Sequence, residues 1–224
     1  MPSIDGRAHA HAPSLREIFD RDSLGDTRIR VDTQQSIYAT GDADDSIYLI
    51  DSGQVKLSMA SAGGKDCLLA IYADGDVFGE SCFSGAPKRF ESAIAMRPTV
   101  VRRASRRDFL AAVQRAGANE VLLRHIAQRM AERQHAVFDL VTTASEKRLA
   151  KVLLAFAEKL GAPDGPFLRL GQRISHEELS QIVGTTRPRV TAFMQRFRTA
   201  GLIETKGRSI SVHRQRILEF LAHD

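Results

Sequence analysis

The chain has 224 residues, a length that suits one large domain or two modest ones. Hydrophobic residues make up 43% of it, which is enough to build real cores. No run of 18 apolar residues is present, and no basic segment precedes an apolar one at the N-terminus. We therefore expect neither a membrane span nor a secretory signal. The two cysteines are too few for a disulfide framework, which predicts a reducing cytoplasm as the location.

The charge is unevenly distributed along the chain. From Ser145 onward there are 14 Lys and Arg against 8 Asp and Glu, a net charge of +6. The first 144 residues hold 18 basic and 19 acidic residues, a net charge of −1. A basic segment attracts polyphosphate, so the C-terminal part is a candidate for binding nucleic acid, and the first part needs another role.

The first part of the chain has the pattern of a β domain between short helices. Residues 1–13 are small and polar, and we predict a mobile N-terminus there. A short helix is expected from Ser14 to Asp20. From Thr27 to Arg106, short runs of β-formers alternate with turn residues, which predicts an antiparallel sandwich or barrel. Residues 107–115 are expected to be helical again.

A long amphipathic helix is predicted next, because no proline or glycine interrupts residues 118–143. One apolar face recurs at helical spacing, at Leu123, Ile126, Met130, Val137 and Val141. This face predicts pairing with a second copy in a coiled coil, and burial against the chain's own β domain is the alternative. Gln134 and the basic residues Arg129 and Arg133 interrupt the face, so the register of the pairing stays open.

A further helix is predicted at residues 146–160, and the segment GAPDGP ends it. Two short helices joined by a tight turn are then predicted between Ile174 and Ile203. Ser175 and Glu178 have the spacing of a capping box at the first helix. Gly184 is expected to end that helix, since glycine is common just past a last turn. The domain boundary is placed at residues 143–146.

The second of these helices has two different faces. Thr186 is expected to cap it, and Pro188 lies in its first turn, where a missing N–H is harmless. A buried stripe is predicted at Val190, Phe193, Met194 and Phe197. The opposite face carries Arg187, Arg189, Thr191, Gln195 and Arg198. This is the layout of a helix-turn-helix whose second helix enters the major groove, and a helical hairpin with a solvated basic face is the alternative.

A small β-ribbon is predicted after Gly201, because LIETKGRSISVH alternates around the Lys206–Gly207 turn. A ribbon at this place would be the wing of a winged helix. The wing favours DNA binding over the plain helical hairpin.

In this order, the elements resemble the CRP/FNR family of bacterial transcription regulators. Four stretches carry the resemblance, which covers residues 15–222: GDADDSIYLIDSGQVKL, DGDVFGES, EKRLAKVLL and HEELSQIVGTTRPRV. The resemblance implies an α+β fold with an antiparallel, jelly-roll-like β-roll, a long dimerisation helix and a winged helix-turn-helix. The corresponding domains would be residues 14–117, 118–144 and 145–224.

The resemblance also implies a site for a small effector in the β-roll. Its residues here would be Phe78, Gly79, Glu80, Ser81, Arg89, Ser92 and Ala93. In members that bind cyclic nucleotides, an Arg-Ser pair meets the phosphate, but this chain has Glu91-Ser92. A carboxylate there repels phosphate, which makes cyclic AMP doubtful, although Arg89 could supply a cation from the same side of an extended strand. Cyclic AMP, another small effector such as a different nucleotide, and no effector all stay open.

Other sensing chemistries that occur in the family have little support here. An iron–sulfur cluster needs an N-terminal set of cysteines that this chain lacks, and haem would need axial ligands. The two cysteines, Cys67 and Cys82, are predicted to be small core residues, with a thiol redox sensor as the alternative. Phe83, Phe90 and Cys82 are expected to make the effector site more apolar than a nucleotide requires. No metal site is predicted.

For the helix-turn-helix, the resemblance implies contacts with bases and with phosphates. Arg187 stands where members of the family read a guanine. Pro188 and Ala192 occupy two other base-reading positions but differ from the residues usual there in the family. Arg189 and Thr191 are the natural substitutes for base contacts. The full predicted set is Ser175, His176, Thr185, Thr186, Arg187, Arg189, Thr191, Arg196 and Arg208. The partners would be an inverted repeat of duplex DNA, a second copy of the chain, and RNA polymerase.

Two other classes of function remain as rivals. No enzyme is expected, because the chain lacks the G-x-S-x-G, H-E-x-x-H, P-loop and G-x-G-x-x-G motifs. The alternative to a DNA-binding regulator is a cyclic-nucleotide-type module that acts through a protein partner. The net charge of +6 in the C-terminal part argues against that alternative.

Overall fold

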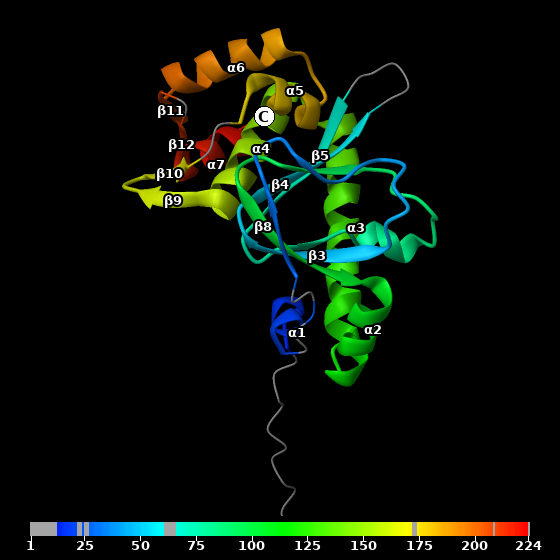
Figure 1. Cartoon of the computed structure of the whole chain (residues 1–224). Helices are drawn as coiled ribbons and strands as arrows, with labels where there is room; N and C mark the ends of the chain where they lie inside the picture. The colour runs from blue at the N-terminus through cyan, green and yellow to red at the C-terminus, as the bar shows by residue number, and fades with distance from the viewer. Residues whose placement is uncertain are drawn as a thin grey trace, which may run out of the picture. The chain divides into compact units, whose positions relative to one another are not determined.

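The computed structural model describes residues 13–21, 24, 27–60, 66–171, 174–207 and 209–223. The predicted mobile N-terminus lies outside these ranges except for Pro13. The chain divides into two compact units, one of Met1–Val55 with Ile71–Met130 and one of Lys56–Ala70 with Ala131–Asp224. Each is described by itself (Figure 1).

The described β strands before the long helix form two four-stranded sheets. They are β1 (Arg28–Val31), β2 (Ser36–Tyr38), β3 (Ser46–Ser52), β4 (Gln54–Ala60), β5 (Asp66–Ala73), β6 (Val77–Phe78), β7 (Ser92–Ala95) and β8 (Thr99–Ser105). The strand order is β1-β8-β3-β6 in one sheet and β2-β7-β4-β5 in the other. The β1–β8, β3–β8, β3–β6 and β2–β7 pairs are antiparallel, which confirms the predicted kind of β domain.

The tight turn from β3 into β4 depends on Gly53. Its φ of 116° lies in the region that favours glycine. A Cβ atom there would also collide with the backbone and side chain of Thr99, at the start of β8. The Thr99 hydroxyl accepts a hydrogen bond from the backbone N–H of Gln54 at 3.1 Å, so this contact fixes the turn against β8.

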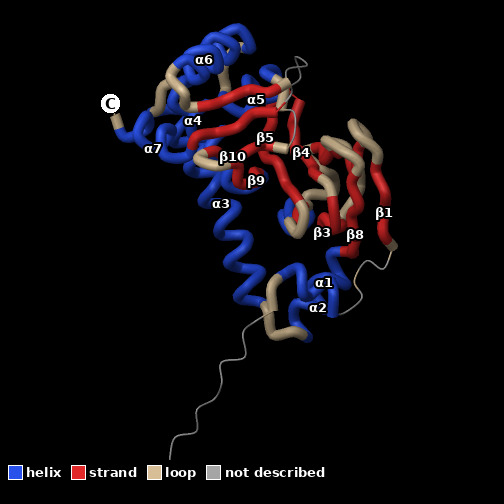
Figure 2. The backbone as a smooth tube through the Cα atoms, turned by 90° about the vertical axis from the view of Figure 1, so that its left-hand side faces the viewer, coloured by secondary structure: helices blue, strands red, loops and turns tan. Residues whose placement is uncertain are grey.

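Two helices cover one end of the β strands of the first unit (Figure 2). They are α1 (Leu15–Arg21) and α2 (Arg106–Arg115), and both confirm the helices expected from the sequence. The rings of Phe19 and Phe109 pack with their centroids 5.6 Å apart. The Ser105 hydroxyl caps α2 by accepting from the backbone N–H of Asp108. The main core of this unit lies between these helices and the strands.

The predicted long helix is α3 (Asn119–Thr142). Leu122 and Ile126 near its start pack against the core of the first unit. Ile126 therefore differs from the other residues predicted to pair with a second copy. Those others are exposed by 67% at Leu123, 59% at Met130, 64% at Val137 and 79% at Val141. Among the described residues, no helix is long and apolar enough to cross a membrane.

The second unit contains the remaining elements. They are α4 (Ser145–Leu160), β9 (Gly161–Asp164), β10 (Phe167–Leu170), α5 (His176–Val183), α6 (Arg187–Thr199), β11 (Ile203–Lys206), β12 (Ser209–His213) and α7 (Arg214–Ala222). The β11 and β12 hairpin confirms the predicted ribbon, and its sheet has the order β11-β12-β10-β9. The segment GAPDGP was expected only to end a helix, but it also begins the β9–β10 hairpin.

Candidate nucleic-acid interface and effector site

The first helix of the helix-turn-helix, α5, begins with the predicted capping box. The Ser175 hydroxyl accepts from the Glu178 backbone N–H, and the Glu178 carboxylate accepts from the Ser175 backbone N–H. Gly184 ends the helix with a φ of 68°, as expected for a left-handed cap. These local interactions fix both ends of α5 and so set where α6 starts (Figure 1).

The N-terminus of α6 differs from the prediction in one respect. Thr186 occupies the position before the helix, but its side chain makes no capping hydrogen bond. Pro188 lies in the first turn, where its missing N–H leaves no donor unsatisfied. The exposed Thr186 side chain is therefore not used to cap the helix.

The two faces of α6 are as predicted. Its buried residues are Val190, Phe193, Met194 and Phe197. The exposed face carries Arg187, Arg189, Thr191, Gln195 and Arg198. A buried stripe holds the helix in place, and the exposed arginines near its N-terminus face solvent.

His176 connects the two helices of the motif. Its Nδ1 atom lies 2.9 Å from the hydroxyl of Thr191, which also donates to the backbone carbonyl of Arg187 at 3.1 Å. Partial burial, and then the nearby charge of Arg187, lower the pKa of His176. The lowered pKa favours a neutral imidazole, and the Thr191 hydroxyl contacts both His176 and the Arg187 carbonyl.

The residues predicted to contact phosphates differ in how many interactions their side chains make within the protein. Arg196 forms an ion pair with Glu146 of α4 at 2.7 Å, and its guanidinium lies 5.1 Å from the ring centroid of Phe193. Thr185 is half-buried beside the turn. Arg208 lies outside the described residues.

Two residues that the sequence did not single out support the motif. Arg148 of α4 donates to the carbonyl of Val183 at 2.9 Å and to that of Thr143 at 2.6 Å. It thereby ties the end of α5 to the chain just before α4. Lys56 of β4 donates to the Glu178 carboxylate at 2.8 Å. Arg148 lies inside the EKRLAKVLL stretch, but nothing in the pattern there predicts its bonding partners.

Arg89, the proposed shifted cation of the effector site, is buried and engaged within the protein. Its side chain is 1% exposed and forms an ion pair with Asp44 at 2.8 Å. It also donates to the carbonyl of Gly79 at 2.7 Å, to the hydroxyl of Ser81 at 2.8 Å and to the carbonyl of Ser46. Burial alone would lower the pKa of Arg89, but the hydrogen bond and charge of Asp44 raise it. Arg89 is therefore a permanent, fully bonded cation.

Glu91 is buried on the same side of the chain as Arg89, with 3% of its surface exposed. One carboxylate oxygen accepts from the Tyr38 hydroxyl at 3.1 Å and from the Ser81 hydroxyl at 2.6 Å. Burial, and then the charge of Glu91, raise the pKa of Tyr38 well above its ordinary value. The phenol thus stays protonated and donates to the carboxylate.

Glu80 and α3 also meet in the first unit. The Nε atom of Arg129 lies 3.9 Å from a carboxylate oxygen of Glu80 and the guanidinium lies 4.6 Å from the ring centroid of Tyr72. Arg129 lies in the first half of α3. Arg129 therefore joins Glu80 to α3.

The other predicted effector residues do not share one environment. Phe78 and Ala93 are fully buried, and Phe78 stacks on Tyr48 with ring centroids 5.2 Å apart. The Ser92 hydroxyl instead accepts from the backbone N–H of Thr40 at 2.9 Å, away from Glu91. Phe90 was expected to line the site, but it is 40% exposed, whereas Arg89 and Glu91 on either side of it are buried.

The two cysteines lie in different environments. Cys82 is buried as predicted, and burial raises the pKa of its thiol to about 11. The prediction that Cys67 is a core residue is wrong, because this residue is exposed at the second position of β5.

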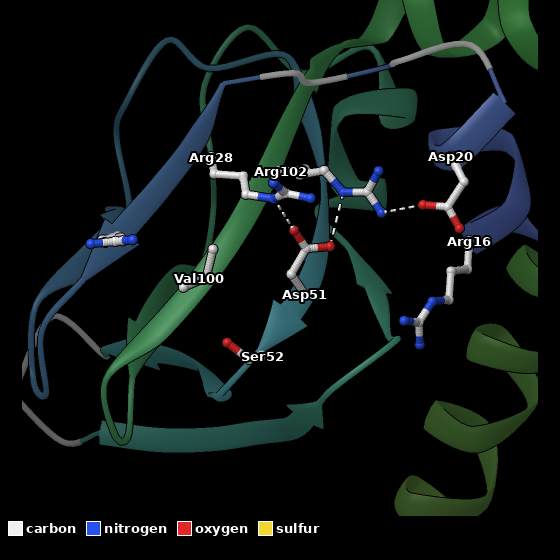
Figure 3. Close-up of a pocket in the computed structure, with 8 residues that line it drawn as sticks. Arg16, Asp20, Arg28, Asp51, Ser52, Val100 and Arg102 are labelled. Carbon is white, nitrogen blue, oxygen red and sulfur yellow. Dashed lines mark hydrogen bonds and ion pairs between the residues drawn. The ribbon is translucent and has the colours of Figure 1, made fainter.

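A hollow lined by arginines lies in the first unit (Figure 3). It measures about 880 Å³, and its lining is Arg16, Asp20, Arg28, Arg30, Asp51, Ser52, Val100 and Arg102. Arg28 and Arg102 are paired across β1 and β8, and Asp51 accepts from the Nε atom of each at 2.9 Å. One carboxylate thus separates two like charges that would otherwise repel.

Comparison with known proteins gives the family of this chain. A model of the cyclic nucleotide-binding domain matches residues 28–116, and a model of the Crp-like helix-turn-helix domain matches residues 147–221. A CRP-like cAMP-activated global transcriptional regulator from Mycobacterium tuberculosis is 33% identical over 180 residues, 79% of this chain and 80% of that protein. The chain belongs to the CRP/FNR family of transcription regulators.

More distant CRP/FNR members agree with this assignment. A global nitrogen regulator from Synechocystis sp. is 25% identical over 204 residues, 90% of this chain and 85% of that protein. The solved structure of FixK2 from Bradyrhizobium japonicum has a TM-score of 0.77 at 21% identity, covers 88% of this chain and 98% of that chain, and shows the shared fold. The chain is thus a DNA-binding transcription regulator of the CRP/FNR type.

Proposed function

We propose that the chain binds an inverted repeat as a homodimer joined along α3. Leu123, Met130 and Val137 are exposed apolar residues that repeat every seven positions, as in a coiled coil. Ala127, Gln134 and Val141 each follow one of them by four residues, so the face has the a and d spacing with one polar position. Two recognition helices would then lie about 34 Å apart, in successive major grooves. In this proposal the domains are residues 14–117, 118–144 and 145–224.

The exposed arginine-rich face of α6 carries this proposal. Arg187 is the proposed base reader, with Arg189 beside it. Thr185, Thr186 and Arg196 would contact phosphates and position the helix without specifying sequence. The Thr191 hydroxyl and the Nδ1 atom of His176 lie 2.9 Å apart. We propose that this pair shapes the DNA-facing surface, and that His176 contacts the DNA backbone near Ser175.

Replacement of Arg187 tests the base-reading role. A bidentate arginine–guanine contact discriminates by about 1–3 kcal/mol, so Arg187→Ala should reduce selectivity for the operator by about 5- to 150-fold and leave nonspecific binding in place. Arg214→Ala, an exposed arginine of α7, is the matched control. Mobility-shift titrations against operator and scrambled duplex measure both. Unchanged selectivity in Arg187→Ala would remove this residue from base reading.

RNA polymerase is the second partner that we propose, with the arginine hollow as the contact surface. Four arginines and two aspartates line it, in a part of the chain that otherwise carries slightly more acidic than basic residues. Both oxygens of Asp51 accept from Nε atoms, which leaves the terminal amino groups of Arg28 to meet an acidic surface. A cytoplasmic location follows from this role.

Charge reversal in the hollow tests the polymerase contact. The double variant Arg28→Glu and Arg30→Glu should lower operator-dependent transcription by a bacterial RNA polymerase several-fold, with operator affinity unchanged. Arg107→Glu, an exposed arginine of α2, is the control and should behave as the wild type. Equal transcription by the double variant would place the polymerase contact elsewhere.

The proposal includes control by a small effector that binds in the β-roll. Such an effector would act by shifting the population between two states of the protein. A ligand there can change DNA binding only if it binds one state of the protein better than the other. The contact of Arg129 with Glu80 provides a route from the β-roll to α3. A module acting only through a protein partner is the alternative, and the absence of any salt-sensitive binding to duplex DNA would favour it.

A further inference from the structure

We propose that the β-roll of this chain carries its own anion, the Glu91 carboxylate, in place of an effector phosphate. The inference rests on the proposed function, because it concerns how the regulator is controlled. It predicts that phosphate-bearing ligands, including cyclic nucleotides, do not bind in the β-roll, and that DNA binding needs none of them.

The first observation concerns the cation that a phosphate would need. Arg89 is the buried arginine beside Glu91, and Asp44 neutralises its charge at 2.8 Å. Three further acceptors within the protein, the carbonyls of Gly79 and Ser46 and the hydroxyl of Ser81, take its other donors. The Tyr38 ring covers the guanidinium, with 4.2 Å between its centroid and the Cζ atom. An incoming phosphate would have to displace these partners to reach the charge.

The second observation concerns the hydrogen-bond donors that remain. Tyr38 and Ser81 both donate to one oxygen of Glu91, at 3.1 Å and 2.6 Å. Ser81 also accepts from Arg89, so the arginine, the serine and the carboxylate form one chain of hydrogen bonds. Donors that could stabilise a bound anion are thus already satisfied by an anion that belongs to the protein.

The third observation concerns the other oxygen of the same carboxylate. Glu91 Oε2 is buried and has no hydrogen-bond partner among the described residues. A phosphate oxygen placed beside it would meet a lone pair and a negative charge, with little water to screen the repulsion. The site therefore repels phosphate, although the relative from Mycobacterium tuberculosis is named as cAMP-activated.

Calorimetry on the intact protein tests the exclusion directly. Titration of 3′,5′-cyclic AMP, and separately of 3′,5′-cyclic GMP, should give no saturable heat up to millimolar concentration. Operator affinity should change by less than about twofold when either nucleotide is added. Saturable binding at micromolar concentration, or a tenfold change in operator affinity, would overturn the proposal. Because calorimetry needs no DNA, a failure of operator binding in the wild type would count against the proposed function alone.

Removal of the internal anion tests its role. Glu91→Ala leaves Tyr38 and Ser81 without their acceptor, so operator affinity and melting temperature should fall, and formate should partly restore both by filling the vacated place. Asp66→Ala, which removes an exposed carboxylate of β5, is the control. It should lower neither operator affinity nor melting temperature, and formate should have no effect on it. An unaltered operator affinity in Glu91→Ala would contradict the proposal.

A second variant keeps the test decisive if Glu91→Ala does not fold. Glu91→Gln retains an acceptor for Tyr38 and Ser81 but removes the negative charge. Inorganic phosphate should then raise the melting temperature of Glu91→Gln above its value in chloride of equal ionic strength, and should leave the wild type unaffected. The same response to phosphate in both proteins would overturn the proposal.

Discussion

Glu178 has two structural roles, in the capping box of α5 and in an ion pair with Lys56. Burial alone would raise the pKa of Glu178, but the hydrogen bonds from Lys56 and Ser175 outweigh it and lower the pKa below its ordinary value of 4.5. The charged form is therefore favoured in the folded state. Its contribution to stability is present above pH 4.5 and is lost as the pH falls through the lowered pKa.

Glu178→Gln should therefore destabilise the protein at neutral pH and much less in acid. The free energy of unfolding should fall by about 1–2 kcal/mol at pH 7, because the variant loses a helix cap together with a half-buried ion pair. Urea unfolding of both proteins from pH 7 to pH 3 measures it, and the difference should shrink below pH 4.5. Glu177→Gln, an exposed neighbour, is the control, and a constant difference at all pH values would contradict this assignment.

Single residues were predictable where their partners are close in sequence. The capping box of Ser175 and Glu178 spans three positions, so its hydrogen bonds follow from local spacing. The exposure of Cys67 was not predictable in this way. The sequence placed Arg89 and Glu91 on one side of the chain, but Asp44 and Tyr38, the partners that define their role, come from distant segments.

Among the elements, α3 combines an apolar face with a long, uninterrupted helix. Its exposed residues Leu123, Met130 and Val137 follow a seven-residue repeat, whereas Leu122 packs into the core of the first unit. In the proposed homodimer, a second copy of α3 would bury this face. Gln134 at a position otherwise apolar is expected to fix the register at some expense of stability.

Val137→Glu should weaken the proposed dimer, because it would bury a carboxylate in the seam. A loss of several kcal/mol would shift the sedimentation profile to monomer at micromolar concentration. Gln128→Glu adds the same charge nine residues away, about 2.5 turns, on the opposite face of α3, and should remain dimeric. An unaltered profile for Val137→Glu would place the subunit contact elsewhere.

The helix-turn-helix could be predicted as an element, whereas the β9–β10 hairpin could not. Caps, a glycine stop and an apolar stripe all lie within the sequence of the motif. Gly161 and Pro163 are residue types common in turns, yet they lie in β9, which pairs with the neighbouring strand β10. β10 in turn pairs with β12, 40 or more residues later, and pairing between distant segments leaves little local signal.

At the scale of the whole molecule, charge and chemistry separate along the chain. The part from Ser145 onward carries a net charge of +6 and exposes the arginines of α6, as a DNA-binding domain requires. The near-neutral first part buries an anion of its own in the β-roll. Regulation without a phosphate ligand and recognition of a symmetric DNA site are the two properties that this arrangement predicts.

Selection of bound duplexes from a random DNA pool by the full chain, without added nucleotide, tests the central claim most directly. The expected result is an inverted repeat whose half-site centres lie about 10 base pairs apart, with a guanine in each half that Arg187→Ala no longer selects. A pool without an enriched motif, or enrichment of a single unrepeated half-site, would contradict the account.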